Sequence, residues 1–229
     1  MACTLNVRRF ASLALPSCLF ALLALPAEAV PARFVRTPDV RGETVVLSWE
    51  GDLFRVPLAG GVAVRMTTHP GNEEAPKISP DGKWVAFSAA YDGPTEVYLM
   101  PMAGGVPKRL TYTGNASPVT FTPDGKRVVF RSGFESTFRP VPRLYSVSLE
   151  GELPEPLPPE RGVLAAYSPD GTKLAYNRRG NEEYYWKRYK GGQYQDIWLY
   201  DFAAKSYTPL TDYVGKNSYP MWALSLIHI

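Results

Sequence analysis

The chain has 229 residues, a formal net charge of +3 and two cysteines. A small charge spread along the chain does not favour nucleic acid as a partner, and we expect none. Both cysteines, Cys3 and Cys18, lie near the N-terminus, so the rest of the chain can form neither a disulfide nor a zinc-thiolate site. The 22 prolines and 19 glycines, with no amphipathic helical pattern beyond the N-terminal region, indicate an all-β protein.

The first 29 residues are predicted to be a signal peptide. Two arginines precede an apolar stretch over residues 10–25, and residues 27–29 fit a small-x-small cleavage site. We therefore expect an exported chain, periplasmic or secreted, whose mature form begins at Val30. The apolar stretch is short and contains Pro16, so we expect no stable membrane span after cleavage of the leader.

One short string occurs three times and defines the fold class. The copies begin 43 and 46 residues apart, and each is followed at once by a strand-like apolar run. They read Ser79-Pro80-Asp81-Gly82-Lys83, Thr122-Pro123-Asp124-Gly125-Lys126 and Ser168-Pro169-Asp170-Gly171-Thr172. A period of about 40–50 residues with four short strands per unit is typical of the blades of a β-propeller.

Each copy predicts a tight turn between two antiparallel strands. The Ser or Thr hydroxyl can bond the local backbone, Pro sets φ at the second position, and Gly suits the last. We expect no further role for these turns, because one aspartate in each is a poor cation site. The sequence accordingly predicts no metal site and no cofactor.

The remaining strands repeat in step with the turns, and the fold class is therefore all-β. We predict a partial β-propeller over residues 30–222, with four four-stranded blades and the start of a fifth. The expected blades are residues 36–68, 69–111, 112–157 and 158–211, with the next beginning at 212–222. Where a further Pro-Asp-Gly turn is due, the chain instead has an apolar tail. We predict that this tail, residues 223–229, is not native, the alternative being a divergent strand.

No catalytic site is predicted in this chain. A Ser-His-Asp arrangement would have to use His69, which lies in a connection between blades and is expected to face solvent. Neighbouring carboxylates such as Glu73/Glu74 and Glu182/Glu183 are expected to point oppositely on a strand or to be solvated in a loop. The chain contains no Gly-x-Ser-x-Gly, Walker or His-Glu-x-x-His pattern.

The fourth unit is longer than the others between its second and third strands, and the extra residues fall in 181–194. Because strand direction alternates within a blade, this segment shares a face with the connections between blades. We call this the loop face, and the opposite side, with the Pro-Asp-Gly turns, the turn face. The substrate-binding candidates are Lys187, Arg188, Tyr189 and Lys190, whose cations could hold a carboxylate while the aromatic ring covers a peptide. Alternatively, the aromatic residues only fix the segment to its own blade.

The same segment carries a resemblance to a known family. Trp186-Lys187-Arg188-Tyr189-Lys190-Gly191-Gly192, followed by Asp196-Ile197-Trp198 and Tyr219-Pro220-Met221-Trp222, resembles the first propeller of tricorn-type, carboxy-terminal-processing-like serine proteases. The resemblance covers residues 33–222. It implies a propeller that handles peptide or protein substrates for PDZ and catalytic domains absent from this chain. In that family basic propeller residues anchor a peptide's C-terminal carboxylate, and Lys187 and Arg188 are the candidates here.

Two other interpretations stay open. Pro-Asp-Gly turns also occur in TolB-type periplasmic propellers, which would make this chain a non-catalytic module for protein–protein interaction. They occur as well in the propellers of prolyl-oligopeptidase-type peptidases. No position in the chain matches the nucleophile of a serine protease, so we assign no catalytic residue under any of these interpretations.

Overall fold

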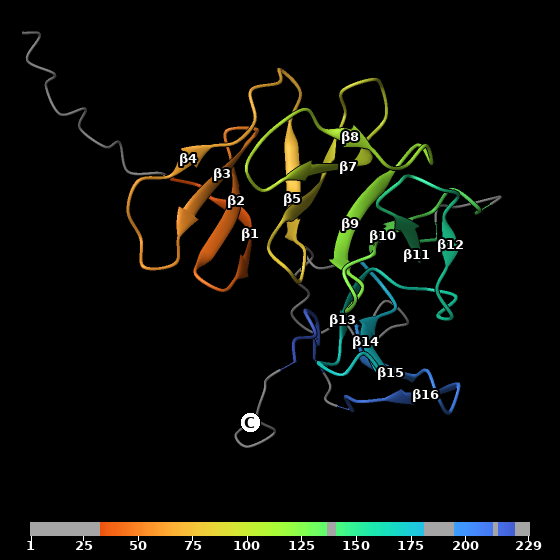
Figure 1. Cartoon of the computed structure of the whole chain (residues 1–229). Helices are drawn as coiled ribbons and strands as arrows, with labels where there is room; N and C mark the ends of the chain where they lie inside the picture. The colour runs from red at the N-terminus through yellow and green to blue at the C-terminus, as the bar shows by residue number, and fades with distance from the viewer. Residues whose placement is uncertain (1–32, 137–140, 181–194, 213–214, 223–229) are drawn as a thin grey trace, which may run out of the picture. The chain divides into compact units, whose positions relative to one another are not determined.

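The structure is a computed structural model that describes residues 33–136, 141–180, 195–212 and 215–222 (Figure 1). The predicted signal peptide and the predicted tail at residues 223–229 lie outside these ranges. The described residues form 16 β-strands and no α-helix, and so contain no helix able to cross a membrane. The prediction of an all-β protein is confirmed.

The strands form four antiparallel sheets of four strands each, in which neighbours in sequence are neighbours in the sheet. Blade 1 contains β1 (Arg36–Arg41), β2 (Thr44–Trp49), β3 (Asp52–Pro57) and β4 (Val64–Arg65). Blade 2 contains β5 (Glu73–Ile78), β6 (Trp84–Ala89), β7 (Glu96–Pro101) and β8 (Lys108–Arg109). Blade 3 contains β9 (Ala116–Phe121), β10 (Arg127–Ser132), β11 (Arg143–Ser148) and β12 (Glu155–Pro156). Blade 4 contains β13 (Leu164–Tyr167), β14 (Lys173–Asn177), β15 (Ile197–Asp201) and β16 (Ser206–Pro209).

The hydrophobic core lies between neighbouring blades rather than inside one of them. One cluster joins Val46 of blade 1 to Phe87 of blade 2, and a second joins Val97 of blade 2 to Phe130 of blade 3. A third links blades 3 and 4. A single four-stranded sheet has no other way to bury its apolar faces, so stacking of successive blades stabilises each one.

The Pro-Asp-Gly turns have the predicted geometry. The Ser79 hydroxyl donates to Oδ1 of Asp81 at 2.6 Å, and the N–H of Gly82 donates to the carbonyl of Ser79 at 2.9 Å. The other two copies repeat both bonds. The hydroxyl bond lowers the pKa of each turn aspartate, and in the third turn it lowers the pKa of Asp170 to about 2.

Successive turns also contact each other, which their sequence did not predict. A Cβ placed on Gly171 would lie 3.1 Å from Cγ of Pro123, the proline of the preceding turn. Gly125 faces Pro80 in the same way at 3.6 Å. Glycine is therefore favoured at position 171 for two reasons. A side chain would crowd Pro123, and the backbone has a φ of +71°, which glycine adopts without strain.

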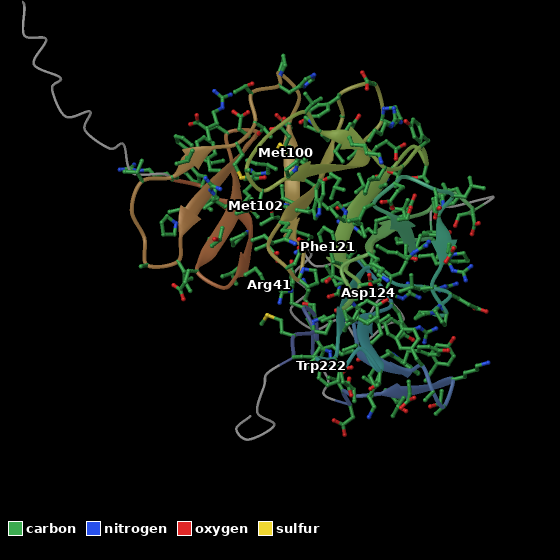
Figure 2. The ribbon with its side chains drawn as sticks, in the orientation of Figure 1. Arg41, Met100, Met102, Phe121, Asp124 and Trp222 are labelled. Atoms are coloured by element: carbon green, nitrogen blue, oxygen red, sulfur yellow. The ribbon has the colours of Figure 1, made fainter. Side chains whose placement is uncertain are left out.

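Residues beyond blade 4 pack against it, where the sequence predicts the next blade to begin. The indole N–H of Trp222 donates to the carbonyl of Ala166 in β13 at 2.9 Å (Figure 2). Tyr219, which precedes a proline, has a positive φ of 61°, as do Thr37 and Ala75 before the prolines of β1 and β5, at 42° and 52°. The register of β1 and β5 shifts at these positions, so a bulge recurs in the first strands of the blades.

Candidate functional site on the loop face

Each connection between blades is bonded to the preceding blade by the same backbone hydrogen bond. In every case a backbone N–H at the start of one blade donates to a backbone carbonyl shortly before the third strand of the preceding blade. The pairs are Glu73 to Gly51 (2.7 Å), Ala116 to Thr95 (2.9 Å), Gly162 to Pro142 (3.1 Å) and Asn217 to Gln195 (2.9 Å). This confirms that the connections and the loops between second and third strands share one face.

Blade 4 departs from blades 1 and 2 at this point, because it has the amide of Asn177 where they have Ser48 and Ser88. Asn177 donates to the carbonyl oxygens of Asp196 at 3.1 Å and Asn217 at 2.7 Å. In blade 1 the hydroxyl of Ser48 makes the matching bond, to the carbonyl of Glu73. The larger amide of Asn177 therefore joins the residue before β15 to the connection that follows blade 4.

The amides of blade 4 also retain unused hydrogen-bonding capacity. Asn177 and Gln195 are 0% and 1% exposed. Oδ1 of Asn177 and both amide atoms of Gln195 are buried without a hydrogen-bond partner. Buried polar atoms in this state usually bind ordered water or a ligand. These two residues border residues 181–194 on either side.

Two cations immediately precede the same segment. The exposed guanidinium of Arg178 lies 5.0 Å from the ring centroid of Trp198, and Arg179 is partly exposed beside it. This pair is not among the binding residues predicted from the sequence, although two consecutive arginines precede the basic, aromatic segment closely. The predicted candidates, Lys187, Arg188, Tyr189 and Lys190, lie outside the described residues, as do Glu182 and Glu183.

The neighbouring carboxylates Glu73 and Glu74 lie on β5 and point oppositely, as expected for residues of a strand. Glu74 is exposed, whereas Glu73 is completely buried at the junction of blades 1 and 2. Its Oε2 accepts a hydrogen bond from Thr67 at 2.8 Å, and its Oε1 accepts one from Tyr91 at 2.6 Å. Burial raises the pKa of Glu73 and is also the largest cause of the raised pKa of Tyr91.

His69 lies beside this junction without a catalytic arrangement. Its ring centroid is 3.9 Å from that of Tyr91, and its Nδ1 accepts a hydrogen bond from the N–H of Gly71. The imidazole is exposed, as expected from its place in a connection. Since no described serine or threonine hydroxyl is bonded to it, the site gives no nucleophile.

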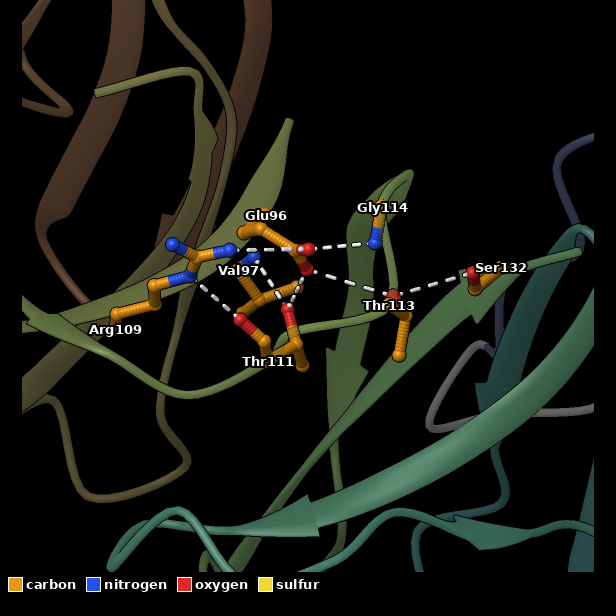
Figure 3. Close-up of polar contacts among 7 residues, drawn as sticks. All are labelled: Glu96, Val97, Arg109, Thr111, Thr113, Gly114 and Ser132. Atoms are coloured by element: carbon orange, nitrogen blue, oxygen red, sulfur yellow. Dashed lines mark hydrogen bonds and ion pairs between the residues drawn. The ribbon is translucent and has the colours of Figure 1, made fainter. Parts of the chain in front are cut away.

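A second buried carboxylate, Glu96, joins blades 2 and 3 (Figure 3). Its Oε1 accepts from the N–H of Gly114 at 2.6 Å and from Arg109 at 3.3 Å, while its Oε2 accepts from Thr111 at 2.6 Å. Thr113 connects this carboxylate to Ser132 of blade 3. Thr111 has a second role that Thr67 and Thr211 share, because the hydroxyl of each also accepts a hydrogen bond from a backbone N–H in the third strand of its blade.

The turn face carries a groove of about 820 Å³ between blades 2 and 3. Two turn aspartates, Asp81 and Asp124, line the same groove together with Trp84 (Asp124 is labelled in Figure 2). Lys126 and Arg127 also line it. Nowhere in the described ranges do three His, Cys, Asp or Glu side chains come together.

Four stacked four-stranded antiparallel sheets define a partial β-propeller. The chain belongs to the family of the tricorn protease N-terminal beta propeller domain, which it matches over residues 32–228. It is 31% identical to tricorn protease homolog 1 of Streptomyces coelicolor over 204 residues, which is 85% of this chain and 18% of the relative. It is 26% identical to a tricorn protease homolog of Saccharolobus solfataricus, covering 80% of this chain and 17% of that protein.

Solved structures agree on the fold. The crystal structure of the tricorn protease matches 82% of this chain and 19% of its own with a TM-score of 0.71 at 22% identity. TolB from Acinetobacter baumannii matches 77% of this chain and 43% of its own with a TM-score of 0.61, also at 22% identity. The chain thus spans less than a fifth of the length of each of the three tricorn proteins named here.

Proposed function

We propose that this propeller receives and orients peptides for an exported tricorn-like serine peptidase whose catalytic domain lies outside this chain. The observation that carries the proposal is the loop face of blade 4. There, exposed Arg178 stacks on Trp198, Arg179 follows it, and the buried amides of Asn177 and Gln195 have unused donors and acceptors. Free cations suit a peptide carboxylate, and free amides suit peptide N–H and C=O groups.

The family membership supports this proposal, because relatives of this chain are named as proteases. Lys187 and Arg188 would extend the same cationic surface. The role is one of binding rather than chemistry, so a peptide that loses its anchor should be turned over with a higher KM and a nearly unchanged kcat.

The test is peptide turnover by the full-length protein. Replacement of Arg178 and Arg179 by Gln is expected to raise KM on the order of tenfold for peptides with a free C-terminus. The same peptides with an amidated C-terminus should be affected little. The charge-matched control is replacement of Lys173 and Lys205, which lie toward the turn face of the same blade. Equal effects on free and amidated peptides would exclude a carboxylate anchor.

A TolB-like interaction module is the second candidate. The turn-face groove beside Trp84 and the fold shared with TolB favour it. This module would leave the full-length protein without peptidase activity, and substitutions in the groove rather than near Arg178 would abolish partner binding. The prolyl-oligopeptidase interpretation rests on a likeness in fold at 15% identity and a TM-score of 0.51.

Export is part of the proposal. A processed protein whose N-terminal residue is Val30, recovered from the periplasm or medium and sequenced from its N-terminus, would support it. A cytosolic protein that retains Met1 would contradict it.

A further inference from the structure

The dipeptide Asp-Gly occurs four times in the chain, and three of the copies belong to the Pro-Asp-Gly turns. The fourth copy, Asp92-Gly93, lies in the loop between β6 and β7, on the loop face of blade 2. An aspartate that precedes glycine can isomerise, because glycine has no Cβ to shield its backbone nitrogen from the aspartate side chain. The chain therefore places the same reactive pair in two different surroundings.

The reaction needs only these two residues and water. The backbone nitrogen of the glycine attacks Cγ of the aspartate, a C–N bond forms, and the carboxyl hydroxyl leaves with the amide proton as water. Water then opens the resulting five-membered succinimide at either of its carbonyls. Opening at Cγ restores aspartate. Opening at the original main-chain carbonyl gives isoaspartate, whose main chain runs through Cβ and Cγ. One water is released and one is consumed, so no oxidant or reductant is required.

In the three turns, hydrogen bonds hold both of the reacting groups. The N–H of Gly82 donates to the carbonyl of Ser79 at 2.9 Å. Oδ1 of Asp81 accepts from the Ser79 hydroxyl at 2.6 Å and from the N–H of Lys83 at 3.1 Å. The other two turns repeat all three bonds. The lowered pKa of each turn aspartate acts in the same direction, because water leaves most readily from a protonated carboxyl. These bonds must break before the glycine nitrogen can attack.

The fourth copy is not held in this way. Asp92 and Gly93 are both exposed, and neither makes a hydrogen bond or an ion pair with any described residue. A Cβ placed on Gly93 would have no atom within 4 Å beyond its chain neighbours, so packing does not restrict the peptide either. Rotation about the bonds of Asp92 can therefore bring Cγ to the nitrogen of Gly93 without the loss of any contact.

The chain is anchored on both sides of this pair. Tyr91 donates to Oε1 of the buried Glu73 at 2.6 Å, and its ring centroid lies 4.6 Å from that of Tyr98. On the other side, the carbonyl of Thr95 accepts from the N–H of Ala116 at 2.9 Å. Isoaspartate adds one carbon to the main chain between these anchors, which is about 1.5 Å of extra length. Because Tyr91 directly precedes the altered residue, the extra length acts first on its bond to Glu73.

We propose that Asp92-Gly93 isomerises spontaneously to isoaspartate, and that the altered loop releases Tyr91 from Glu73 at the junction of blades 1 and 2. The modification leaves an isoaspartyl α-carboxylate exposed on the loop face, a group that isoaspartyl carboxyl methyltransferases recognise. The proposal is independent of the proposed function, because neither residue belongs to the blade 4 site.

The first experiment compares the four copies within one protein. The full-length protein is incubated for several weeks at mildly acidic pH, and aspartyl and isoaspartyl peptides from a digest are quantified by mass spectrometry. Isoaspartate is expected to form at Asp92 on the order of tenfold or more faster than in the turns, because the turn copies must first break hydrogen bonds. In protein unfolded by urea, the four rates should converge. Equal rates in the folded protein, or isoaspartate in the turns alone, would overturn the proposal.

Two variants test the chemistry at single positions. Thr122→Val keeps the shape of the side chain but removes the hydroxyl that holds Asp124, so isoaspartate should form several-fold faster at Asp124 and at an unchanged rate at Asp92. Asp92→Glu keeps the charge but would have to close a six-membered ring, so methylation by an isoaspartyl carboxyl methyltransferase should fall to the level of the turns. An unchanged rate at Asp124 in Thr122→Val would contradict the protection assigned to the turn bonds.

Hydrogen–deuterium exchange tests the effect on the junction. After incubation, the amides of β5 in the wild-type protein should exchange several-fold faster than before, since Tyr91 no longer holds Glu73. Asp92→Glu incubated in the same way should show no change, and Tyr91→Phe without incubation should reproduce the faster exchange. Unchanged exchange of β5 in protein that carries isoaspartate at position 92 would refute the release of Tyr91.

Discussion

Two junctions between blades each bury a carboxylate, but the groups that surround it differ. Glu73 and Glu96 are both completely buried, and each accepts a hydrogen bond from a threonine that follows a fourth strand, Thr67 after β4 and Thr111 after β8. Glu96 also faces the guanidinium of Arg109, whereas the donors to Glu73 among the described residues are the hydroxyl groups of Thr67 and Tyr91. Burial removes water from the charged carboxylate, and no described cation is paired with Glu73 to offset this loss. Burial therefore disfavours the charged form and raises the pKa of Glu73. One junction therefore contains a carboxylate paired with a cation, and the other a carboxylate whose pKa is raised by burial.

The largest effect is expected from removal of the charge at the paired junction. Glu96→Gln leaves Arg109, whose side chain is 19% exposed, without its counter-charge. We expect the free energy of unfolding to fall by about 3 kcal/mol at pH 7, measured by urea denaturation. Adding Arg109→Met should recover part of this loss. A loss of under about 1 kcal/mol in the free energy of unfolding of Glu96→Gln would show that the Glu96–Arg109 ion pair contributes little to stability.

A smaller effect is expected from the hydroxyl of the unpaired junction. Tyr91→Phe removes one of two side-chain donors to Glu73 and should cost about 1.5–3 kcal/mol, also by urea denaturation. Tyr98→Phe is the matched control, because the buried Tyr98 hydroxyl has no hydrogen-bond partner. It should be neutral or slightly stabilising. Similar losses in both variants would contradict the assigned role of the Tyr91 bond.

The protonation of Glu73 should be visible as a pH dependence. Its pKa in the folded protein is raised above the ordinary value of 4.5, so its contribution to stability is fully present below that pH and is lost as the pH rises through the raised pKa. The free energy of unfolding of Glu73→Gln should thus lie within about 1 kcal/mol of the wild-type value at pH 7 and fall further below it as the pH approaches 4.5. Measured free energies of unfolding that differ by the same amount at every pH would exclude this mechanism.

The smallest effect is expected at the exposed turns. The Ser168 hydroxyl lowers the pKa of Asp170 from 3.8 to about 2, so the stabilisation that it provides is present above pH 3.8 and is lost as the pH falls toward 2. Asp170→Asn should therefore be as stable as the wild type near pH 2 and slightly less stable than the wild type at neutral pH. Carboxyl NMR titration checks this directly, and an ordinary titration midpoint near 3.8 would contradict it.

Most of the fold could be predicted because the same local sequence pattern recurs from blade to blade. The Ser/Thr-Pro-Asp-Gly string specifies a turn by the chemistry of its own residues, and three copies fix the period. The contact of Gly171 with Pro123 could not be predicted, because it depends on how one blade stacks on the next. Family membership followed from the Trp186–Gly192 string, which is specific, and the match over residues 32–228 confirms it.

The candidate site was harder to predict, since its residues come together from separate blades. The sequence left open whether Glu73 and Glu74 point oppositely on a strand or are solvated in a loop, and the contacts with Thr67 and Tyr91 show that Glu73 is buried. Arg178 became a candidate through its contact with Trp198, 20 residues further along the chain. Periodicity in a sequence locates strands, but it does not report which side chains of adjacent blades meet.

The most direct test of the central claim is to identify which face of the propeller contacts a peptide. A hexapeptide with a photoreactive residue next to a free C-terminus can be cross-linked to the full-length protein, and the adducts mapped by mass spectrometry. Peptide handling on the loop face predicts adducts at residues 178–198, with loss of those adducts when the peptide is amidated. Adducts confined to the turn face, around Trp84 and Asp124, would contradict the account.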